Sequence, residues 1–506
     1  MLRIVRTENG LVRGIPAADP RITAFRGIPF AAPPVGENRW RAPQPCGNWE
    51  GTLDCARFAP ISMQEVPGIG DNIYIREWHV DPDVPMSEDC LYLNVWTNAK
   101  TADDRLPVLV WFFGGGLQYG YPSEMEFDGE RIARRGVVVV TVNYRIGVLG
   151  FLAHPQLTRE QPDAPANFGS LDQQAGLRWV RRNIAAFGGD PDNVTIAGQS
   201  AGGGSVLSQV ACRENEGLFR RAVVMSATIR DPYGGRDIGR PEPLIEAERN
   251  GEAFFDFIGA KDLEQARAMD AALIRDRYAV FMREHRPMFN ALDGRFCVGD
   301  PMRQYLEGDC VDVPMLAGNT ADEFPSAIDA EDPAGLQAQA RRLFGDDAGR
   351  FLAFAESRER SDAGFGAVNG LELTARGLFE AVAARGRRNY HYRFDADIPG
   401  WDHPGTFHSV DLWFWFETLA KCWRPFVGRH YDLARQMCDY LVNFIRSGDP
   451  NGVDSNGEPL PEWRPHTAEA PCTMVFATSG ATPDTREATP FERFLTERIM
   501  ERLSKG

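Results

Sequence analysis

Cysteine is scarce in this sequence. The chain has nine cysteines in 506 residues, an odd number, and no two of them form a Cys-x-x-Cys pair. This usage is typical of reduced thiols rather than of a disulfide-rich secreted scaffold. The opening residues, MLRIVRTENGLVRG, carry charge from the third position and lack the apolar stretch of a signal peptide. We therefore expect a cytoplasmic protein.

Basic residues are outnumbered by acidic ones, and long apolar runs are absent. The 55 Lys and Arg residues face 71 Asp and Glu residues, which gives a formal net charge of −16 at pH 7. This balance argues against non-specific binding to nucleic acid or to an anionic membrane. Apolar runs of about 18 residues are absent, so no membrane-spanning helix is expected. With 43% hydrophobic and 25% charged residues, the chain looks globular.

No repeat, low-complexity tract or linker divides the chain; strand-like and helical stretches alternate instead. The runs 106–113 and 136–144 are apolar throughout, as in buried parallel strands. Further strands are expected at 194–197, 219–227, 311–319 and 389–397, and an amphipathic helix at 171–188. This alternation predicts an α/β fold with a large, mostly parallel sheet flanked by helices. We expect one catalytic domain, 1–506, with helical insertions at roughly 228–300 and 331–388 over the active-site face.

A candidate nucleophile lies in the pattern Gly198-Gln199-Ser200-Ala201-Gly202. G-x-S-x-G alone is a weak signal, because glycine is common here. Its context strengthens it: β-branched residues at 194–197 predict a strand before Ser200, and apolar residues at helical spacing over 205–211 predict a helix after it. A serine on such a sharp strand-to-helix turn is typical of a hydrolase nucleophile.

A serine hydrolase also needs oxyanion donors, an acid and a base. The glycines 114–116 follow a strand and can supply backbone donors, and the N–H of Ala201 can add another. The acid is expected after a late strand, where Asp322 and Glu323 are equally suitable. Of the histidines downstream, His408 has the best position, at a loop that enters a helix, and His403 is its nearest rival.

Several long segments resemble type-B carboxylesterases, the cholinesterase-like branch of the α/β-hydrolases. They are SEDCLYLNVW (87–96), FFGGG (112–116), NYRIGVLGF (143–151), the stretch 172–203 around the candidate serine, and GTFHSVD (405–411). The resemblance covers essentially the whole chain. It implies an α/β-hydrolase fold whose helical insertions form a lid or gorge. It further implies Ser200 as nucleophile, Glu323 as acid and His408 as base, with Gly115, Gly116 and Ala201 as oxyanion donors.

The sequence departs from the family pattern at four places. Phe113 stands where the family commonly has histidine, and Phe324 where glycine commonly follows the acid. Cys90 matches a cysteine that is often disulfide-bonded, but Ser62 occupies its partner's position, so this disulfide is expected to be absent. Gln199 replaces the usual glutamate beside the nucleophile, which removes a negative charge from the expected site.

These features predict a serine carboxylesterase that hydrolyses small to medium carboxylic esters through an acyl-enzyme, without metal or organic cofactor. Its partner is expected to be a small-molecule ester rather than a nucleic acid. The same triad could act mainly on amides, thioesters or carbamates. A catalytically inactive binding or adhesion homologue is the alternative from another class, although such members typically lose the triad. The substrate pocket is expected to involve Phe113, Leu117, Gln199, Phe324 and Trp413.

Overall fold

The computed structural model describes residues 1–506 except 228–239, 324–329, 331, 357–387, 468 and 506. Its main sheet has eleven strands in the described residues, in the order β16-β15-β14-β13-β10-β9-β7-β8-β6-β4-β3. In chain order these are β3 (Ile15–Pro16), β4 (Thr23–Pro29), β6 (Tyr92–Thr97), β7 (Leu106–Phe112), β8 (Val138–Val142), β9 (Gly189–Gln199), β10 (Arg221–Met225), β13 (Met315–Thr320), β14 (Asn389–Asp395), β15 (Thr473–Ala477) and β16 (Gly480–Asp484).

The centre of this sheet is parallel and its two edges are antiparallel. All neighbouring strands from β8 through β7, β9, β10, β13 and β14 to β15 pair in parallel. The strands β6, β4 and β3 at one edge, and β16 at the other, pair antiparallel. The predicted large, mostly parallel sheet is thus confirmed. Two small sheets stand outside it, one of β1 (Ile4–Arg6), β2 (Leu11–Arg13) and β5 (Thr52–Asp54), the other of β11 (Glu242–Pro243) and β12 (Ala291–Leu292).

Helices cover both faces of the sheet, which explains why the central strands are apolar throughout. Alternate residues of β7 join two different buried clusters: Leu109 and Trp111 face one, and Val108, Val110 and Phe112 face the other. The first cluster includes residues of α2 (Glu130–Arg134), α14 (Leu412–Trp415) and α15 (Gly428–Ser447). The second includes residues of α5 (Phe168–Asn183), α6 (Ala201–Ala211) and α10 (Pro301–Glu307).

Most predicted elements are present with shifted ends. The helix expected at 171–188 begins earlier, as α5 at Phe168, and its last residues form a 3-10 turn, Ile184–Phe187. The strand expected at 194–197 is longer, since β9 extends from Gly189 to Gln199. Short helices complete this part of the chain: α1 (Ile73–Glu77), α3 (Gly147–Phe151) and α4 (Pro155–Glu160).

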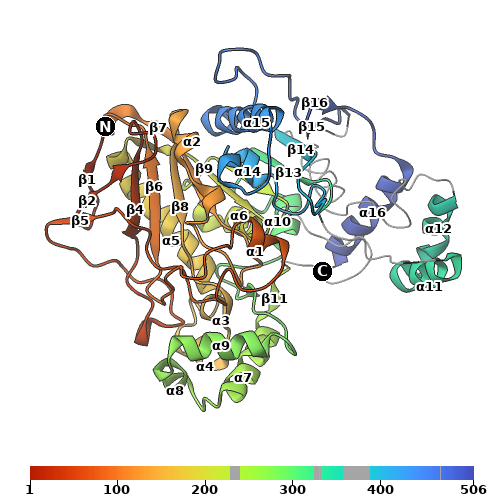
Figure 1. The fold of residues 1–506 in the computed structure, drawn as a ribbon. Helices are drawn as coiled ribbons and strands as arrows, with labels where there is room; N and C mark the ends of the chain where they lie inside the picture. Colours follow the sequence, from red (N-terminus) through yellow and green to blue (C-terminus); the bar gives the residue numbers. More distant parts are fainter. Residues whose placement is uncertain (228–239, 324–329, 331, 357–387, 468, 506) are drawn as a thin grey trace.

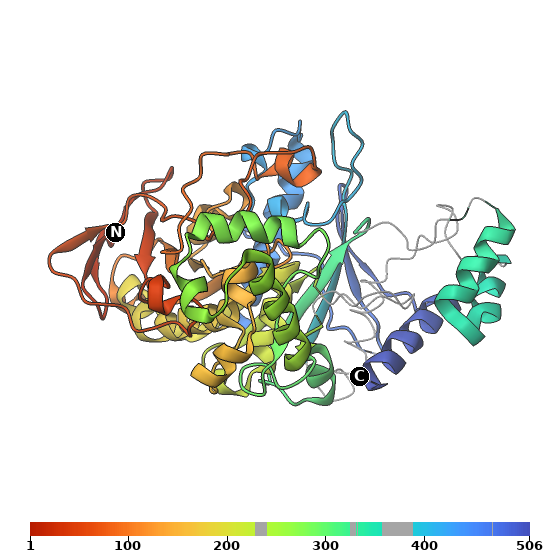
Figure 2. The same cartoon turned by 90° about the horizontal axis from the view of Figure 1, so that it is seen from below.

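The two regions expected as insertions lie at different places. The described part of the first forms α7 (Leu244–Ile258), α8 (Leu263–Ala268) and α9 (Ala271–Phe281), which lie beside α3 and α4 (Figure 1). The described part of the second forms α11 (Pro333–Phe344) and α12 (Ala348–Glu356), which stand with α16 (Pro490–Lys505) at one end of the molecule (Figure 2). Among the described residues, none of these or the other helices is both long and apolar enough to cross a membrane.

Candidate active site

Five parallel strands bring the candidate residues to one edge of the sheet. The glycine loop follows β7, Ser200 follows β9, Ser226 follows β10, Glu323 follows β13, and the loop that carries His408 follows β14. In open α/β sheets the carboxyl ends of parallel strands form the usual place for a ligand. The topology therefore gathers side chains that are more than 200 positions apart in the sequence, as Ser200 and His408 are.

Ser200 occupies a strained turn between β9 and α6. Its backbone has φ 55° and ψ −126°, a conformation that L-residues rarely adopt, and its N–H donates to the carbonyl of Met225 (2.9 Å). The turn is possible because Gly202 has no side chain: a Cβ there would lie 2.1 Å from the carbonyl oxygen of Phe112. Helix α6 begins at Ala201, directly after Ser200, so its N-terminal dipole lies beside the hydroxyl.

The loop of glycines 114–116 rests against this turn. A Cβ on Gly114 would lie 2.7 Å from the carbonyl oxygen of Gln199 and 3.1 Å from Cβ of Ser200. Gly115 and Gly116 both have positive φ, 99° and 64°. The contact at Gly114 thus places the start of the glycine loop directly against Ser200.

His408 and Glu323 meet in the interior. Nδ1 of His408 contacts Oε2 of Glu323, and both side chains are almost completely buried. The other carboxylate oxygen of Glu323 accepts from the hydroxyl of Ser226 and from the backbone N–H of Thr320 (2.9 Å). Both oxygens of the carboxylate are thus held, which orients it toward the histidine. Ser226 was not foreseen; its position directly after a parallel strand is the signal that could have found it.

The two candidate acids and the two candidate histidines have different surroundings in the structure. Oδ2 of Asp322 accepts from the backbone N–H and the hydroxyl of Thr406, each at 2.9 Å. Asp322 therefore ties down the loop that carries His408 but does not face its ring. His403 is exposed at the surface with φ 45°, whereas His408 is buried beside Glu323.

Gln199 contacts the opposite side of the His408 ring. Its Nε2 lies 3.3 Å from Nε2 of His408, and the glutamine is buried. Because Nδ1 of His408 faces a carboxylate, we assign its proton to that nitrogen. Nε2 then has a lone pair, and the amide of Gln199 can donate to it. Nε2 of His408 thus points toward the turn that carries Ser200.

A second buried carboxyl group, Asp411, lies behind this pair. Its Oδ2 accepts from the hydroxyl of Tyr392 (2.8 Å) and from Nε1 of Trp415 (3.2 Å). Burial, and then the nearby charge of Glu323, raise the pKa of Asp411 to about 6. Burial, and then the same charge, raise the pKa of Tyr74 to about 12, which indicates that helix α1 also lies near Glu323.

The residues expected to line the pocket have different surroundings. Leu117 follows the glycine loop at φ 59° and is nearly buried. Phe113 is completely buried and stacks on Tyr144, with ring centroids 4.2 Å apart. Trp413 is also completely buried and lies edge-on to Trp78, with ring centroids 6.2 Å apart. The rings of Phe113 and Trp413 therefore present no exposed surface to a substrate. Phe324 lies outside the described residues.

Cys90 lies against Ser62, as the resemblance implied. The Ser62 hydroxyl is within hydrogen-bonding reach of the Cys90 thiol, and burial raises the pKa of that thiol. All nine cysteines are among the described residues, and no disulfide bond joins any two of them. The described part of the chain also holds no group of three or more His, Cys, Asp or Glu residues arranged to bind a metal ion.

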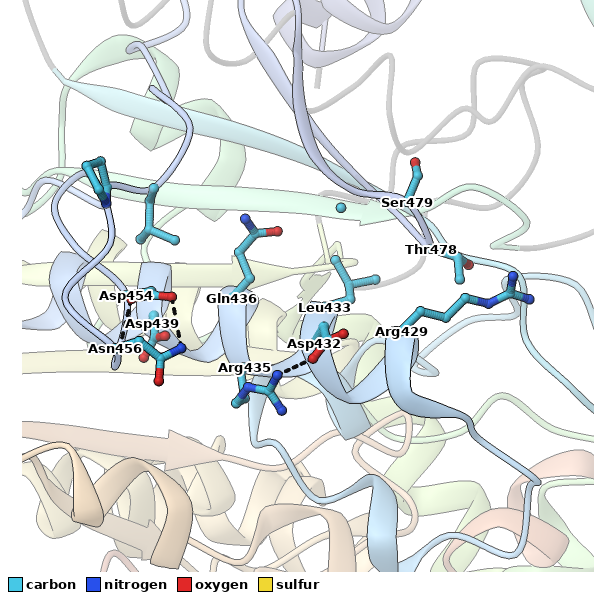
Figure 3. A pocket seen from close by; sticks show the side chains of 13 residues that line it. Arg429, Asp432, Leu433, Arg435, Gln436, Asp439, Asp454, Asn456, Thr478 and Ser479 are labelled. Carbon is cyan, nitrogen blue, oxygen red and sulfur yellow. Dashed lines mark hydrogen bonds and ion pairs between the residues drawn. The ribbon is translucent and has the colours of Figure 1, made fainter.

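A separate hollow of about 380 Å³ lies on the outer side of α15, between that helix, the 454–460 loop and the β15–β16 turn (Figure 3). Its charged groups are largely matched within the protein. Arg435 pairs with Asp432, Asp439 pairs with Arg135, and Asp454 accepts from backbone N–H groups of its own loop. None of the candidate catalytic residues lines it.

Comparison with known proteins gives consistent matches. A sequence model described as the carboxylesterase family matches residues 2–363 and 370–491. The fumonisin B1 esterase of Sphingopyxis macrogoltabida is 34% identical over 476 residues, which cover 89% of this chain and 83% of that protein. The para-nitrobenzyl esterase of Bacillus subtilis (strain 168) is 31% identical over 468 residues, which cover 89% and 91%.

Solved structures resemble the whole chain. The crystal structure of a Geobacillus stearothermophilus carboxylesterase at pH 6.8 aligns with a TM-score of 0.76 and 31% identity, over 97% of this chain and 99% of that one. A PNB esterase structure aligns with a TM-score of 0.77 and 27% identity, over 98% and 100%.

Proposed function

The chain belongs to the carboxylesterase family, and we propose that it hydrolyses small to medium carboxylic esters through an acyl-enzyme formed on Ser200. It is a carboxylic ester hydrolase with the α/β-hydrolase fold. The observation that carries the proposed site is the buried contact between His408 Nδ1 and Glu323 Oε2 beside the strained turn at Ser200. That arrangement supports Ser200 as nucleophile, His408 as base and Glu323 as acid.

The proposed reaction has two acyl-transfer steps. His408 Nε2 takes the proton of Ser200 as Oγ attacks the ester carbonyl, and then gives it to the departing alcohol. Water, activated by the same nitrogen, releases the acid from the acyl-enzyme. Glu323 keeps the proton on Nδ1 and stabilises the imidazolium that forms after each transfer. This route uses only groups of the chain, so we expect no metal or organic cofactor.

The oxyanion of each tetrahedral intermediate needs hydrogen-bond donors close to Ser200. We assign this role to the backbone N–H groups of Gly115, Gly116 and Ala201, because the glycine loop packs directly against Ser200. One donor of this type is typically worth about 3–4 kcal/mol of transition-state stabilisation.

Gln199 makes the site less negative than the usual family pattern. A glutamate at this position would add a charge beside the imidazolium, whereas the amide of Gln199 is neutral and can only donate a hydrogen bond to His408 Nε2. Stabilisation of the imidazolium therefore depends mainly on Glu323, and we propose that the site favours neutral esters.

We further propose that residues 1–506 form one catalytic domain and that the protein works in the cytoplasm. The family model, which matches nearly the whole chain, supports the first proposal. The second is supported by the nine cysteines, none of which forms a disulfide bond, because thiols stay reduced in that compartment.

Replacement of the nucleophile tests the proposed function. We expect Ser200→Ala to lower kcat for p-nitrophenyl butyrate by about 10⁴-fold or more, because the covalent route is lost. His408→Ala should produce a comparable loss. His403→Ala is the matched control and should keep most of the activity, since that side chain is exposed. Activity within tenfold of wild type in Ser200→Ala would refute the assignment, and equal losses in the two histidine variants would mean that the base is misassigned.

A further inference from the structure

A glutamine outside the triad holds the backbone behind the oxyanion loop. Gln64 uses both ends of its side-chain amide on one residue, Gly120. Its Oε1 accepts from the N–H of Gly120 (2.9 Å) and its Nε2 donates to the carbonyl of Gly120 (2.9 Å). Gln64 and Gly120 are both buried, so these two bonds replace water at each polar group of the Gly120 backbone.

Gly120 in turn supports the glycine loop. The loop folds back on itself: the N–H groups of Gln118 and Tyr119 both donate to the carbonyl of Gly115, at 3.0 and 2.9 Å. A Cβ on Gly115 would lie 2.2 Å from the carbonyl oxygen of Tyr119, and one on Gly120 would lie 2.7 Å from that of Gly114. The peptide between Tyr119 and Gly120 is therefore packed directly against Gly114 and Gly115.

The glycine loop thus lies between two fixed surfaces. On one side it touches the turn at Gln199 and Ser200, and on the other it touches the peptide that Gln64 holds. A backbone rich in glycine has little stiffness of its own, so the position of its N–H groups depends on what packs against it. We propose that Gln64 is a positioning residue for catalysis, which fixes the oxyanion loop through Gly120; this inference rests on the proposed function.

The segment around Gln64 is itself anchored. Ile61 exchanges backbone hydrogen bonds with the 85–87 segment: its N–H donates to Pro85 (2.8 Å), and its carbonyl accepts from Ser87 (3.0 Å). The hydroxyl of Tyr119 donates to Glu65 (3.0 Å), which adds a second link between the two segments. Gln64 therefore links the oxyanion loop to a segment that is itself held by backbone hydrogen bonds.

The test uses Gln64→Met, which keeps the length and volume of the side chain but forms neither hydrogen bond. Without them, two buried polar groups of Gly120 lack partners and the peptide must move. We expect kcat for p-nitrophenyl butyrate to fall by about tenfold or more while KM stays within about threefold, because oxyanion donors act mainly in the transition state. The affinity for a trifluoromethyl ketone, which forms a tetrahedral adduct, should weaken by about the same factor as kcat.

The matched control is Gln436→Met. Gln436 also accepts from a backbone N–H, that of Ala481 (3.0 Å), but it lines the hollow on α15 (Figure 3), to which no residue of the oxyanion loop contributes. This variant should keep wild-type kcat and ketone affinity. If Gln64→Met folds poorly, Gln64→Glu answers the same question: its carboxylate accepts from the Gly120 N–H but cannot donate to the carbonyl, so kcat and ketone affinity should fall together by about threefold or more.

A Gln64 variant with kcat within twofold of wild type, or with a lower kcat but unchanged ketone affinity, would overturn the proposal. Failure of the proposed function gives a different result. In that case wild-type enzyme would not bind the ketone covalently, or Ser200→Ala would remain active, whatever the Gln64 variants do.

Discussion

Asp411 illustrates how a single residue near the site can make the whole protein sensitive to pH. Its carboxyl group is completely buried, and burial raises its pKa to about 6. The ionised form is therefore disfavoured in the folded protein relative to the unfolded chain. Protonated Asp411 therefore contributes to the free energy of unfolding. This contribution is fully present below the usual pKa of an aspartic acid and is lost as the pH rises through about 6.

Asp411→Asn should remove this pH dependence. The amide oxygen can still accept from Tyr392 and Trp415, but it has no proton to lose. Between pH 4.5 and 7.5 the free energy of unfolding of the variant should rise relative to wild type by roughly 2 kcal/mol. Urea unfolding at the two pH values measures this difference. If the free energy of unfolding of the variant differs from that of wild type by the same amount at both pH values, Asp411 keeps one protonation state over the whole range.

The local structure around a side chain was predictable where one motif fixes both the residue and its neighbours. Ser200 and its flanking glycines were identifiable because the strained turn needs small residues at fixed spacing. Asp322 and Glu323 were not separable from residue types, since both are acids after the same strand. What distinguishes them is a contact across the fold: Asp322 binds Thr406, and Glu323 binds His408. Gln64 carried no local signal of this kind, and Ser226 only that of its position after a strand.

At the scale of elements, the segment from Ile61 to Ser87 forms a loop closed by backbone hydrogen bonds at its base. It carries helix α1 and Trp78, whose ring stacks on Phe407, the neighbour of His408. The resemblance implied a missing disulfide at this base, and the structure places Ser62 beside Cys90 there. The base is thus held by hydrogen bonds and packing instead of a covalent link.

Ser62→Cys should restore that link. The new thiol would face Cys90, and the bond would close a loop of about 30 residues, which predicts a stabilisation of about 3–4 kcal/mol. After expression in an oxidising compartment, the variant should show a higher Tm that returns to the wild-type value when reductant is added. Wild-type protein with and without reductant is the control. A variant whose mass shows a disulfide but whose Tm does not change would indicate that the loop base is already rigid.

Strands were easier to predict than helix ends. Central strands such as β7 and β8 are apolar on both faces, because two helical layers cover them, and that pattern is visible in the sequence. The start of α5 was placed three residues late, since its first turn, Phe168 to Ser170, follows Asn167 in a left-handed conformation rather than a typical N-cap. The conformation of that turn depends on tertiary contacts, such as the bonds from Asn167 to Ala291 and Asp293.

At the scale of the whole molecule, the hydrophobic interior is divided unequally. Two large clusters fill the two faces of the main sheet. A third, much smaller cluster joins α11 and α12 to the first half of α16, and it stands apart from the sheet (Figure 2). The second half of α16 contacts a main cluster through Ile499 and Leu503. The sequence predicted helix at 331–388 but not α16 or the packing between them, because the docking of apolar helix faces depends on the folded chain.

This division predicts that the small cluster can be weakened without loss of activity. Phe494 packs among Phe344, Phe354 and Arg350. Phe494→Ala removes a large buried ring, a change that typically costs about 3–5 kcal/mol locally. Hydrogen exchange should become faster in α11, α12 and the first half of α16, while β7 and β9 stay protected and kcat/KM for p-nitrophenyl butyrate stays within twofold.

The matched control is Phe476→Ala, which makes the same substitution in the main core, where Phe476 contacts Tyr392 and Trp463. That variant should lower Tm for the whole protein and speed exchange in the central strands. If Phe494→Ala also exposed β7 and β9, or lowered kcat/KM by tenfold, the small cluster would be cooperative with the catalytic core. The second half of α16 would then be the element that couples them, because it is the part of that helix that contacts the sheet-side cluster.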